Sequence, residues 1–479
     1  MKERLTFGHG AHVAVPSRAL AATAELAHEP REFKFTHLET WDWGWGGLLM
    51  FSILLFFRPQ DQIAAMGRAH FSDLSAIVGL VAMVFVNLGR RQSPIRVTAE
   101  VGALFALGAV LLIGVPFSTW PGGSFEVFTT MFVQVSLIFL LMVNTVTSPK
   151  RVERICWVIV LAFGYISIRV IYDYMRGLHI VEGNRAAGPI GGFFENPNDL
   201  ALNLVAFLPL AMMYVKRPGP ALKRLMCAGI TVLMLITLFL TRSRSGMVGA
   251  VAMFAVFVLT ARMLKPGYIL AAVVAGMLVL PNLPATFWSR MESITDAEKD
   301  PTGSRKERMD LMQQGITVAL EHPITGVGAG QFKNFAPPGE TLKRWRETHN
   351  VYLQVAAELG IFGFALFMFL IARAVQAGWW TRRTLAWIHR PPRRRKGTPA
   401  DDPADGLTEH DRVFLEGHGA AMVACVVGWA VCAFFASVAF NWTIYYLLGL
   451  AVTGRDVVRA RRVAYAKAKA IAEQEVVAA

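Results

Sequence analysis

Apolar residues dominate long stretches of the chain, and polar residues gather in the segments between them. An apolar run of roughly 17–25 residues can cross the hydrocarbon core of a bilayer as a helix. The pattern predicts about twelve membrane-spanning helices, at 44–57, 73–88, 98–116, 125–145, 153–175, 198–215, 223–241, 245–263, 267–284, 349–376, 417–437 and 441–454. The expected fold class is therefore all-α, that of a polytopic integral membrane protein.

Polar segments divide this helical chain into parts. The predicted parts are an N-terminal extension, 1–42; helices one to nine, 43–284; a large loop, 285–348; helices ten to twelve, 349–454, with a second loop at 377–415; and a basic tail, 455–479.

The large loop contains its own helical pattern. Ser304 and Glu307 have the spacing of a capping box, S-x-x-E, which begins many helices. Apolar residues then recur at helical spacing, at Met309, Met312, Ile316 and Leu320. The loop is expected to hold an amphipathic helix over 304–321 that lies at the membrane surface.

Lysine and arginine predict the orientation of the helices. With the N-terminus in the cytoplasm, the inner segments hold 32 of these residues and the short outer loops hold 6. Cytoplasmic loops of membrane proteins carry such an excess, whereas long loops cross regardless of charge. Both termini are therefore expected in the cytoplasm, and the loop 285–348 on the outer side.

Composition excludes several classes of protein. Of the 479 residues 54% are apolar and only 17% are charged, which excludes a soluble enzyme, a disordered chain and a disulfide scaffold. The net charge of +14 follows from the topology and from contact with anionic inner-leaflet lipid, so nucleic acid is not an expected partner. The four cysteines lie in apolar runs and no histidines have metal-ligand spacing, so no metal or other cofactor is expected.

Polar residues suited to chemistry gather at the predicted outer ends of the helices. They are Arg185, Asn196 and Asn198 before helix six, Arg242 and Arg244 between helices seven and eight, Arg305 and Arg308 in the loop helix, and His349 and Asn350 before helix ten. Each arginine alone could contact lipid phosphates or water, and His349 alone could be structural. Their shared depth favours a common site instead.

That depth is the level of lipid headgroups, where a lipid-linked diphosphate would lie. Arginine binds phosphate oxygens through two parallel hydrogen bonds and stays charged at any relevant pH. Arginines at a helix N-terminus oppose the helix dipole, which an anion bound among them would offset. Histidine can accept a proton from a sugar hydroxyl near neutral pH. The pattern indicates that arginines stabilise a leaving diphosphate while His349 activates an acceptor.

Two other features are assigned structural roles. Glu358 follows His349 by nine residues, about 13 Å of helix rise, and is expected to bind a neighbouring helix. The glycine-rich run 326–330 lacks the Lys-Ser/Thr of a P-loop, so we interpret it as a flexible turn.

Four segments together resemble the O-antigen ligase and polymerase superfamily. They are GFFENPNDLA at 192–201, TRSRSG at 241–246, the region 303–332 with GSRKER and HPITGVGAGQF, and THNVYLQVAAELGIFG at 348–363. The resemblance implies a glycosyltransferase of the bacterial inner membrane. It takes a glycan from undecaprenyl diphosphate on the periplasmic side and transfers it, without a metal, to an acceptor sugar.

The resemblance also assigns roles to residues. His349, Arg305 and Arg244 match the family's catalytic positions, with Arg242 as the alternative to Arg244 at the turn. The large loop becomes a periplasmic loop above the site. The expected substrate-binding residues are Arg242, Arg308, Arg185, Asn196, Asn198 and Asn350.

The acceptor stays open at this point. A ligase would use lipid A core, a polymerase the growing end of another glycan, and a protein O-oligosaccharyltransferase a serine or threonine. Membrane lipid and a chain-length regulator are further expected partners. The rival interpretations are a twelve-span transporter or lipid-linked-oligosaccharide flippase, and a non-catalytic scaffold. A transporter would place its polar groups near the bilayer midplane in two repeated halves, a pattern that the sequence does not show.

Overall fold

The computed structural model describes residues 4–6, 12–14, 42–62, 71–182, 184–189, 194–217, 219–261, 304–335, 347–388 and 406–478. Its elements are β1 (Arg4–Thr6), β2 (His12–Ala14), α2 (Trp43–Phe57), α3 (Pro59–Gln62), α5 (Phe71–Gly89), α6 (Ala99–Gly114), η1 (Val115–Phe117), α7 (Pro121–Val127), the π-helix η2 (Phe128–Phe132), α8 (Val133–Thr145), α9 (Pro149–Met175), β3 (Ile180–Val181), β4 (Arg185–Ala186), α10 (Pro197–Lys216), α11 (Ala221–Thr241), α12 (Arg244–Thr260), α15 (Ser304–Glu321), η6 (Phe332–Asn334), α16 (Val351–Ile388), α17 (Glu409–Ala433) and α18 (Trp442–Ala478). The strands form two short antiparallel pairs, β1 with β2 and β3 with β4.

The described structure is almost entirely helical, in agreement with the predicted all-α membrane class. Within the described ranges, eight helices are long and apolar enough to cross a membrane: α5, α6 with η1, the continuous helix α7–η2–α8, α9, α10, α11, α16 and α17. Two shorter apolar helices, α2 and α12, occupy the predicted spans 44–57 and 245–263. The ninth predicted span, 267–284, lies outside the described residues, so the count of twelve stays a prediction.

Two helices continue beyond their predicted ends. The span predicted to end at 376 continues to Ile388 in α16, and the span predicted to end at 454 continues to Ala478 in α18. Part of the predicted loop 377–415 and nearly all of the predicted tail 455–479 are therefore helical. The apolar pattern marks only the part of a helix that lies in the membrane. Alanine, lysine, arginine and glutamate are good helix formers, so they continue the helix into polar surroundings.

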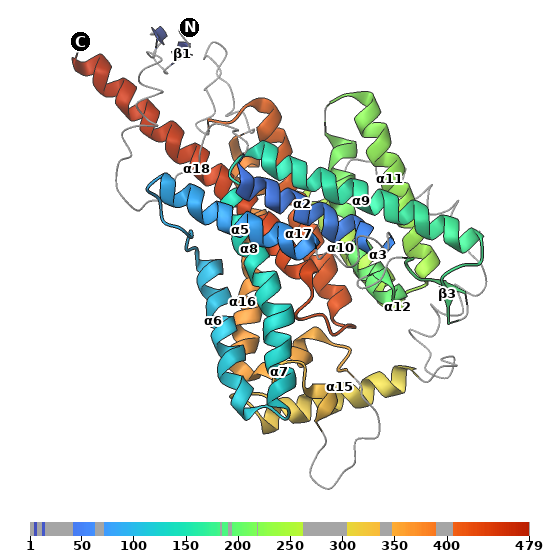
Figure 1. The fold of residues 1–479 in the computed structure, drawn as a ribbon. Coiled ribbons are helices and arrows are strands. Elements are labelled where there is room, and N and C mark those ends of the chain that lie inside the picture. The colour runs from blue at the N-terminus through green and yellow to red at the C-terminus, as the bar shows by residue number, and fades with distance from the viewer. Residues whose placement is uncertain are drawn as a thin grey trace.

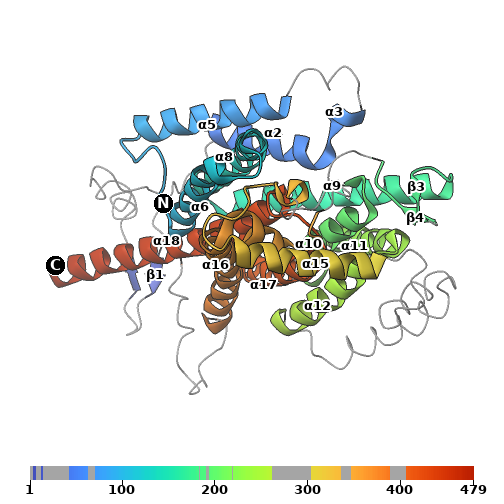
Figure 2. The same cartoon turned by 90° about the horizontal axis from the view of Figure 1, so that it is seen from below.

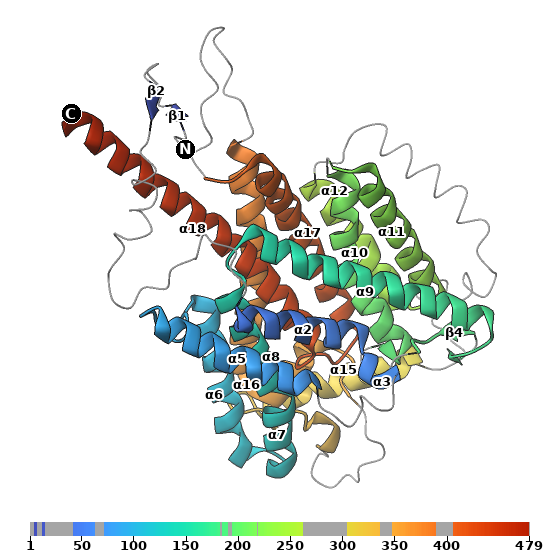
Figure 3. The same ribbon diagram turned by 45° about the horizontal axis from the view of Figure 1, so that its top comes forward.

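Helix α17 lies at the centre of the bundle, where it packs against α10, α12, α16 and α18 (Figure 1). Helix α2 lies between α5 and α9 on one side (Figure 3). Helix α5 exposes Leu74, Ile77 and Phe85, which is typical of a lipid-facing surface. Helix α15 lies at the lower end of the bundle in Figure 1, crosses it in the view from below (Figure 2), and packs against α16.

Polar contacts join helix ends that the sequence analysis places on one side of the membrane. Asp42 before α2 accepts a 2.6 Å hydrogen bond from Arg151 at the start of α9, and both are predicted to be cytoplasmic. At the predicted outer ends, Arg185 donates to the carbonyl oxygen of Thr241 at 3.0 Å. The relative sidedness of these helices therefore agrees with the predicted topology, while the absolute orientation stays a prediction.

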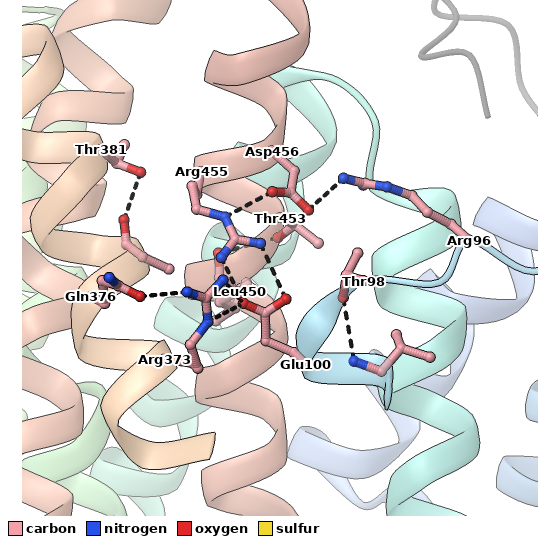
Figure 4. A network of polar contacts seen from close by, with 12 residues as sticks. Arg96, Thr98, Glu100, Arg373, Gln376, Thr381, Leu450, Thr453, Arg455 and Asp456 are labelled. Carbon is pink, nitrogen blue, oxygen red and sulfur yellow. Dashed lines mark hydrogen bonds and ion pairs between the residues drawn. The ribbon is translucent and has the colours of Figure 1, made fainter. Parts of the chain in front are cut away.

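A buried ionic network joins α6, α16 and α18 (Figure 4). The Glu100 carboxylate accepts from Arg455 at 2.6 Å and from Arg373 at 2.7 Å, and it is fully buried. Arg455 also contacts Asp456 at 2.8 Å, and Asp456 contacts Arg96 at 2.7 Å. All five residues lie near the predicted cytoplasmic ends of the spans 98–116, 349–376 and 441–454. The network therefore holds together three helices whose opposite ends approach the candidate site.

Replacing Glu100 with glutamine is expected to lower the free energy of unfolding by about 3–5 kcal/mol, because two arginines lose their buried counter-charge. The change is measured by thermal unfolding of the purified protein in detergent. Glu409→Gln is the matched control. The side chain of Glu409 is 70% exposed in its ion pair with Arg412, so the control should lose little stability. Equal losses in the two variants would contradict this role for Glu100.

Candidate functional site

The segment 241–246, which we call the arginine turn, joins α11 to α12. Arg242 ends α11 in the left-handed conformation, with φ of 48°. Ser243 caps α12 by accepting the N–H of Gly246, and Arg244 is the first residue of that helix. A left-handed residue followed by a serine cap ends one helix and begins the next within a few residues. The two arginines therefore stand at one end of adjoining helices, as the sequence predicts.

Arg185 holds the arginine turn against the strand pair β3–β4. Its guanidinium donates to the carbonyl oxygen of Thr241 at 3.0 Å, to Glu182 at 2.8 Å and to Asn198 Oδ1 at 2.6 Å. The residue is only 4% exposed. Burial and the nearby charge of Arg244 lower the pKa of Arg185, while Glu182 opposes this shift. Arg185 thus lies near Arg244, but its guanidinium group donates its hydrogen bonds to other groups of the protein.

The two predicted asparagines occupy the start of α10. Asn196 caps the helix, and its Oδ1 accepts the N–H of Asn198 at 2.8 Å. Asn198 Oδ1 accepts from Arg185 and, at 2.9 Å, from the hydroxyl of Ser243. Together with Arg185 they form a scaffold beneath the arginine turn, a role that the amide-rich sequence alone does not reveal.

The two arginines of the turn differ in exposure. Arg242 is 7% exposed, and its guanidinium reaches the hydroxyl of Tyr174 at 3.4 Å. Arg244 is half-buried, and its charge acts on the guanidinium of Arg185. Arg244 is therefore the more accessible of the two to a ligand.

The predicted loop helix is confirmed as α15, with the bounds 304–321. It buries Leu311 and Val318, and Gly315 between them packs beside Thr348 and Leu353 at the start of α16. Its predicted apolar face is turned away from the protein, with exposures of 60% for Met309, 49% for Ile316 and 75% for Leu320. The position at the membrane surface stays a prediction. Arg308 is half-buried, and the side chain of Arg305 lies outside the described part of the structure.

His349 lies immediately before α16 and also has a left-handed backbone, with φ of 48°. Its N–H donates to the hydroxyl of Ser437 at 3.0 Å, and the Thr348 hydroxyl lies 3.1 Å from the same oxygen. A non-glycine residue keeps this conformation only where its surroundings enforce it. Ser437, in the α17–α18 connection, therefore fixes the position of His349.

Asn350 completes this turn as the cap of α16. Its Oδ1 accepts the N–H of Tyr352 at 2.9 Å and that of Leu353 at 3.1 Å. The residue is 1% exposed. Its amide oxygen is therefore engaged with the helix start, which positions His349 relative to α16.

An electrostatic interaction links the segment before His349 to the start of α10, which contacts the arginine turn through Asn198 and Ser243. The charges of Asp199, next to Asn198, and of Glu347, two residues before His349, are close enough to interact. Withdrawal from water raises the pKa of the Glu347 carboxyl, and Lys333 and Ser437 oppose this rise. The side chain of Glu347 is exposed, but in a concave space where protein atoms replace much of the solvent. The two predicted clusters thus belong to one region.

A cavity of about 590 Å³ opens beside this region. Its walls come from α7–η2–α8, the segment 330–334, the start of α16 and the α17–α18 connection. Lining residues that the sequence reasoning missed include Glu126, Gln134, Glu347, Gln354, Ser437 and Asn441. The one available signal was a charged or amide residue inside an apolar span, because such residues often mark functional sites.

Glu358 also lines this cavity, which corrects the expectation that it binds a neighbouring helix. Its carboxylate accepts the N–H of Gly330 at 2.8 Å. The run 326–330 is not a free turn either, since Val327 donates to the carbonyl of Ala357 at 2.9 Å and Gly328 to that of Glu358 at 3.0 Å. These carbonyls are available because α16 is broken at Gly360. Irregular backbone at membrane depth is tolerated where it lines a cavity.

Replacing Gly360 with alanine is expected to destabilise this loop strongly. Gly360 has φ of 64° and ψ of −168°, a conformation essentially restricted to glycine, and an added Cβ would lie 2.3 Å from the carbonyl oxygen of Ile324. The unfolding temperature and the transfer activity should both fall. Gly229→Ala in α11 is the control, because nothing lies within 4 Å of its added Cβ. An unchanged unfolding temperature in Gly360→Ala would contradict the structural role of this break.

The described residues include no group of three or more histidine, cysteine, aspartate or glutamate side chains arranged to hold a metal ion. The four cysteines are buried and form no disulfide bonds.

Comparison with known proteins adds one finding. A family model described as O-antigen ligase matches residues 229–368. The matched range contains the arginine turn, α15, His349 and the broken part of α16, whereas Arg185 and Asn198 lie before it. No curated protein matches the chain. The match to this family over 229–368, on a helical membrane fold that brings the arginine turn and His349 into one region, supports membership of the O-antigen ligase superfamily.

Proposed function

We propose that the chain transfers a glycan from undecaprenyl diphosphate to an acceptor sugar on the periplasmic side of the bacterial inner membrane, without a metal ion. Family membership supports glycosyl transfer of the O-antigen ligase type in general. The observation that carries the finer proposal is the rigid arginine turn in the same region as a histidine held by Ser437.

The proposed reaction assigns a task to each group. The oxygen of an acceptor hydroxyl attacks the anomeric carbon of the donor, and its proton passes to His349 as general base. The bond between that carbon and the diphosphate oxygen breaks with inversion. Arg244 and Arg305 stabilise the negative charge on the departing undecaprenyl diphosphate, with Arg242 and Arg308 as further binding groups.

The scaffold residues act through position. Arg185, Asn196 and Asn198 hold the arginine turn, and Asn350 with Ser437 holds His349. Preorganised groups lower the barrier because they need not reorient as charge develops. We therefore propose that these residues support both substrates without taking part in bond exchange.

The proposed setting follows the sequence analysis. Both termini are cytoplasmic, α15 lies at the outer surface, and membrane lipid surrounds the bundle. A chain-length regulator is a proposed partner.

The test uses the purified protein in lipid vesicles with the lipid-linked glycan isolated from the host's membranes. Mass analysis follows the lipid-linked products and any added lipid A core or peptide. New glycosidic bonds with release of undecaprenyl diphosphate would support the proposal. A donor that crosses the vesicle membrane unchanged would instead support a flippase.

A further inference from the structure

The cavity beside His349 has a chemistry unlike that of the arginine turn. Its volume of about 590 Å³ falls in the range of about 300–1,000 Å³ that is typical of ligand pockets. Of the described residues, Glu126, Glu347 and Glu358 line it, together with one cation, Lys333. No arginine is among its lining residues in the described part of the chain. An ionised carboxylate such as that of exposed Glu126 repels an anion, so this wall suits a diphosphate less well than the arginine turn does.

Amide and aromatic side chains complete the wall. Gln134 and Asn441 each offer both donors and acceptors of hydrogen bonds. The Oδ1 atom of Asn441 is buried with no hydrogen-bond partner among the described residues. Trp120 and Trp442 add flat apolar surfaces. A sugar ring presents C–H groups on its faces and hydroxyls around its edge, so this combination fits an uncharged glycan.

One polar stripe of the cavity belongs to a helix of membrane-spanning length. Glu126, Thr130 and Gln134 follow one another at intervals of four along α7–η2–α8, and all three are exposed and line the cavity. The π-helical turn Phe128–Phe132 lies between the first and the last of them. Polar groups are costly against lipid, and π-helical turns are frequent at functional sites. The stripe is therefore suited to a wet, ligand-filled space.

The cavity reaches the backbone that carries His349. Glu347, Thr348 and Ser437 line it, and Ser437 accepts the N–H of His349 at 3.0 Å. Asp199, whose neighbour Asn198 accepts from Ser243 of the arginine turn, interacts electrostatically with Glu347 of the same segment. The backbone of His349 thus adjoins a cavity rich in carboxyl, amide and aromatic groups, and the arginine turn belongs to the same region.

We infer that this cavity binds the acceptor, and that the acceptor is the uncharged end of a glycan rather than a phosphorylated lipid A core. The inference rests on the proposed function, in which the arginine turn binds the donor diphosphate. A hydroxyl at the inner end of the bound sugar lies beside His349, to which its proton passes. The structure thereby favours a polymerase over a ligase.

The test measures transfer to two acceptors with the full-length protein in lipid vesicles. The donor is the lipid-linked glycan from the host's membranes. One acceptor is the same glycan released by mild acid and labelled with a fluorophore at its reducing end, and the other is phosphorylated lipid A core. The wild-type protein should use the released glycan in preference to the core.

Variants of the polar stripe separate the two substrates. Gln134→Leu should raise the KM for the released glycan about tenfold, as expected when one hydrogen bond to a ligand is lost, and should leave the KM for the donor unchanged. Glu126→Gln should reduce the preference for the released glycan over the phosphorylated core. The substitution removes one negative charge that repels the phosphate groups of the core. Thr129→Val on the same helix is the control, because Thr129 does not line the cavity.

The outcomes distinguish this inference from the function on which it rests. A higher KM for the donor alone, in either Gln134→Leu or Glu126→Gln, would overturn the assignment of the cavity to the acceptor. A wild-type preference for phosphorylated core would overturn the assignment of an uncharged acceptor. If the wild-type protein transferred glycan to neither acceptor, the proposed function itself would be contradicted, and this inference with it.

Discussion

Replacing His349 with asparagine is expected to lower kcat for glycosyl transfer by about 10²–10⁴-fold, the usual effect of losing a general base. Asparagine tolerates the left-handed backbone that His349 adopts, so the N–H bond to Ser437 should persist. An amide cannot take up the acceptor's proton. Binding of the donor should stay near the wild-type value, because the arginine turn is unchanged. Initial rates and donor binding are measured with the same purified samples.

His179→Asn is the matched control for this variant. His179 also has a left-handed backbone, with φ of 50°, and lies on the same predicted side of the membrane. It contacts Asp173 at 3.2 Å and does not line the cavity. Transfer by this control should stay close to wild type. Comparable losses in both variants, or full activity in His349→Asn, would remove the assignment of His349 as base.

Replacing Arg244 with alanine is expected to weaken donor binding by about 10–100-fold, because a hydrogen bond to a charged group contributes about 1.5–3 kcal/mol. The kcat should fall as well, since negative charge grows on the leaving diphosphate. Arg244→Lys should be intermediate, because lysine keeps the charge but not the two parallel hydrogen bonds. Donor affinity and initial rates are measured for both variants.

Arg176→Ala is the control for the loss of positive charge on this side. Arg176 is exposed at the end of α9 and donates to the hydroxyl of Tyr172 at 2.8 Å. The Arg176→Ala variant should bind the donor as tightly as the wild-type protein does. Thermal unfolding separates function from folding: since the charge of Arg244 opposes that of buried Arg185, its removal should leave the unfolding temperature near the wild-type value. Unchanged donor affinity in Arg244→Ala would contradict its role.

Much of the fold could be predicted from the chain because hydropathy and capping act locally. Apolar runs located the described membrane helices, and the capping box at Ser304 located the start of α15. The continuation of α16 and α18 was missed because a hydropathy pattern reports the membrane, whereas a helix also forms in polar segments. The break at Gly360 was missed because it depends on a loop that donates to the freed carbonyls.

The candidate site was predictable in its residues more than in their contacts. Arginines, asparagines and a histidine at one depth indicated an outer site, and the structure joins Arg185, Asn198 and the arginine turn by hydrogen bonds. Sequence alone could not show that Arg185 is buried as a support. It also could not show the cavity, because its walls come from segments separated by some 300 residues, from Trp120 to Trp442.

The most direct test of the central claim counts leaving groups. Purified protein in lipid vesicles is given lipid-linked donor and labelled acceptor, and released undecaprenyl diphosphate is compared with new glycosidic bonds. We predict one leaving group for each bond with the wild-type protein and with His179→Asn, and almost none with His349→Asn. Donor that is moved across the vesicle membrane without release of undecaprenyl diphosphate, or release that does not depend on His349, would contradict the account.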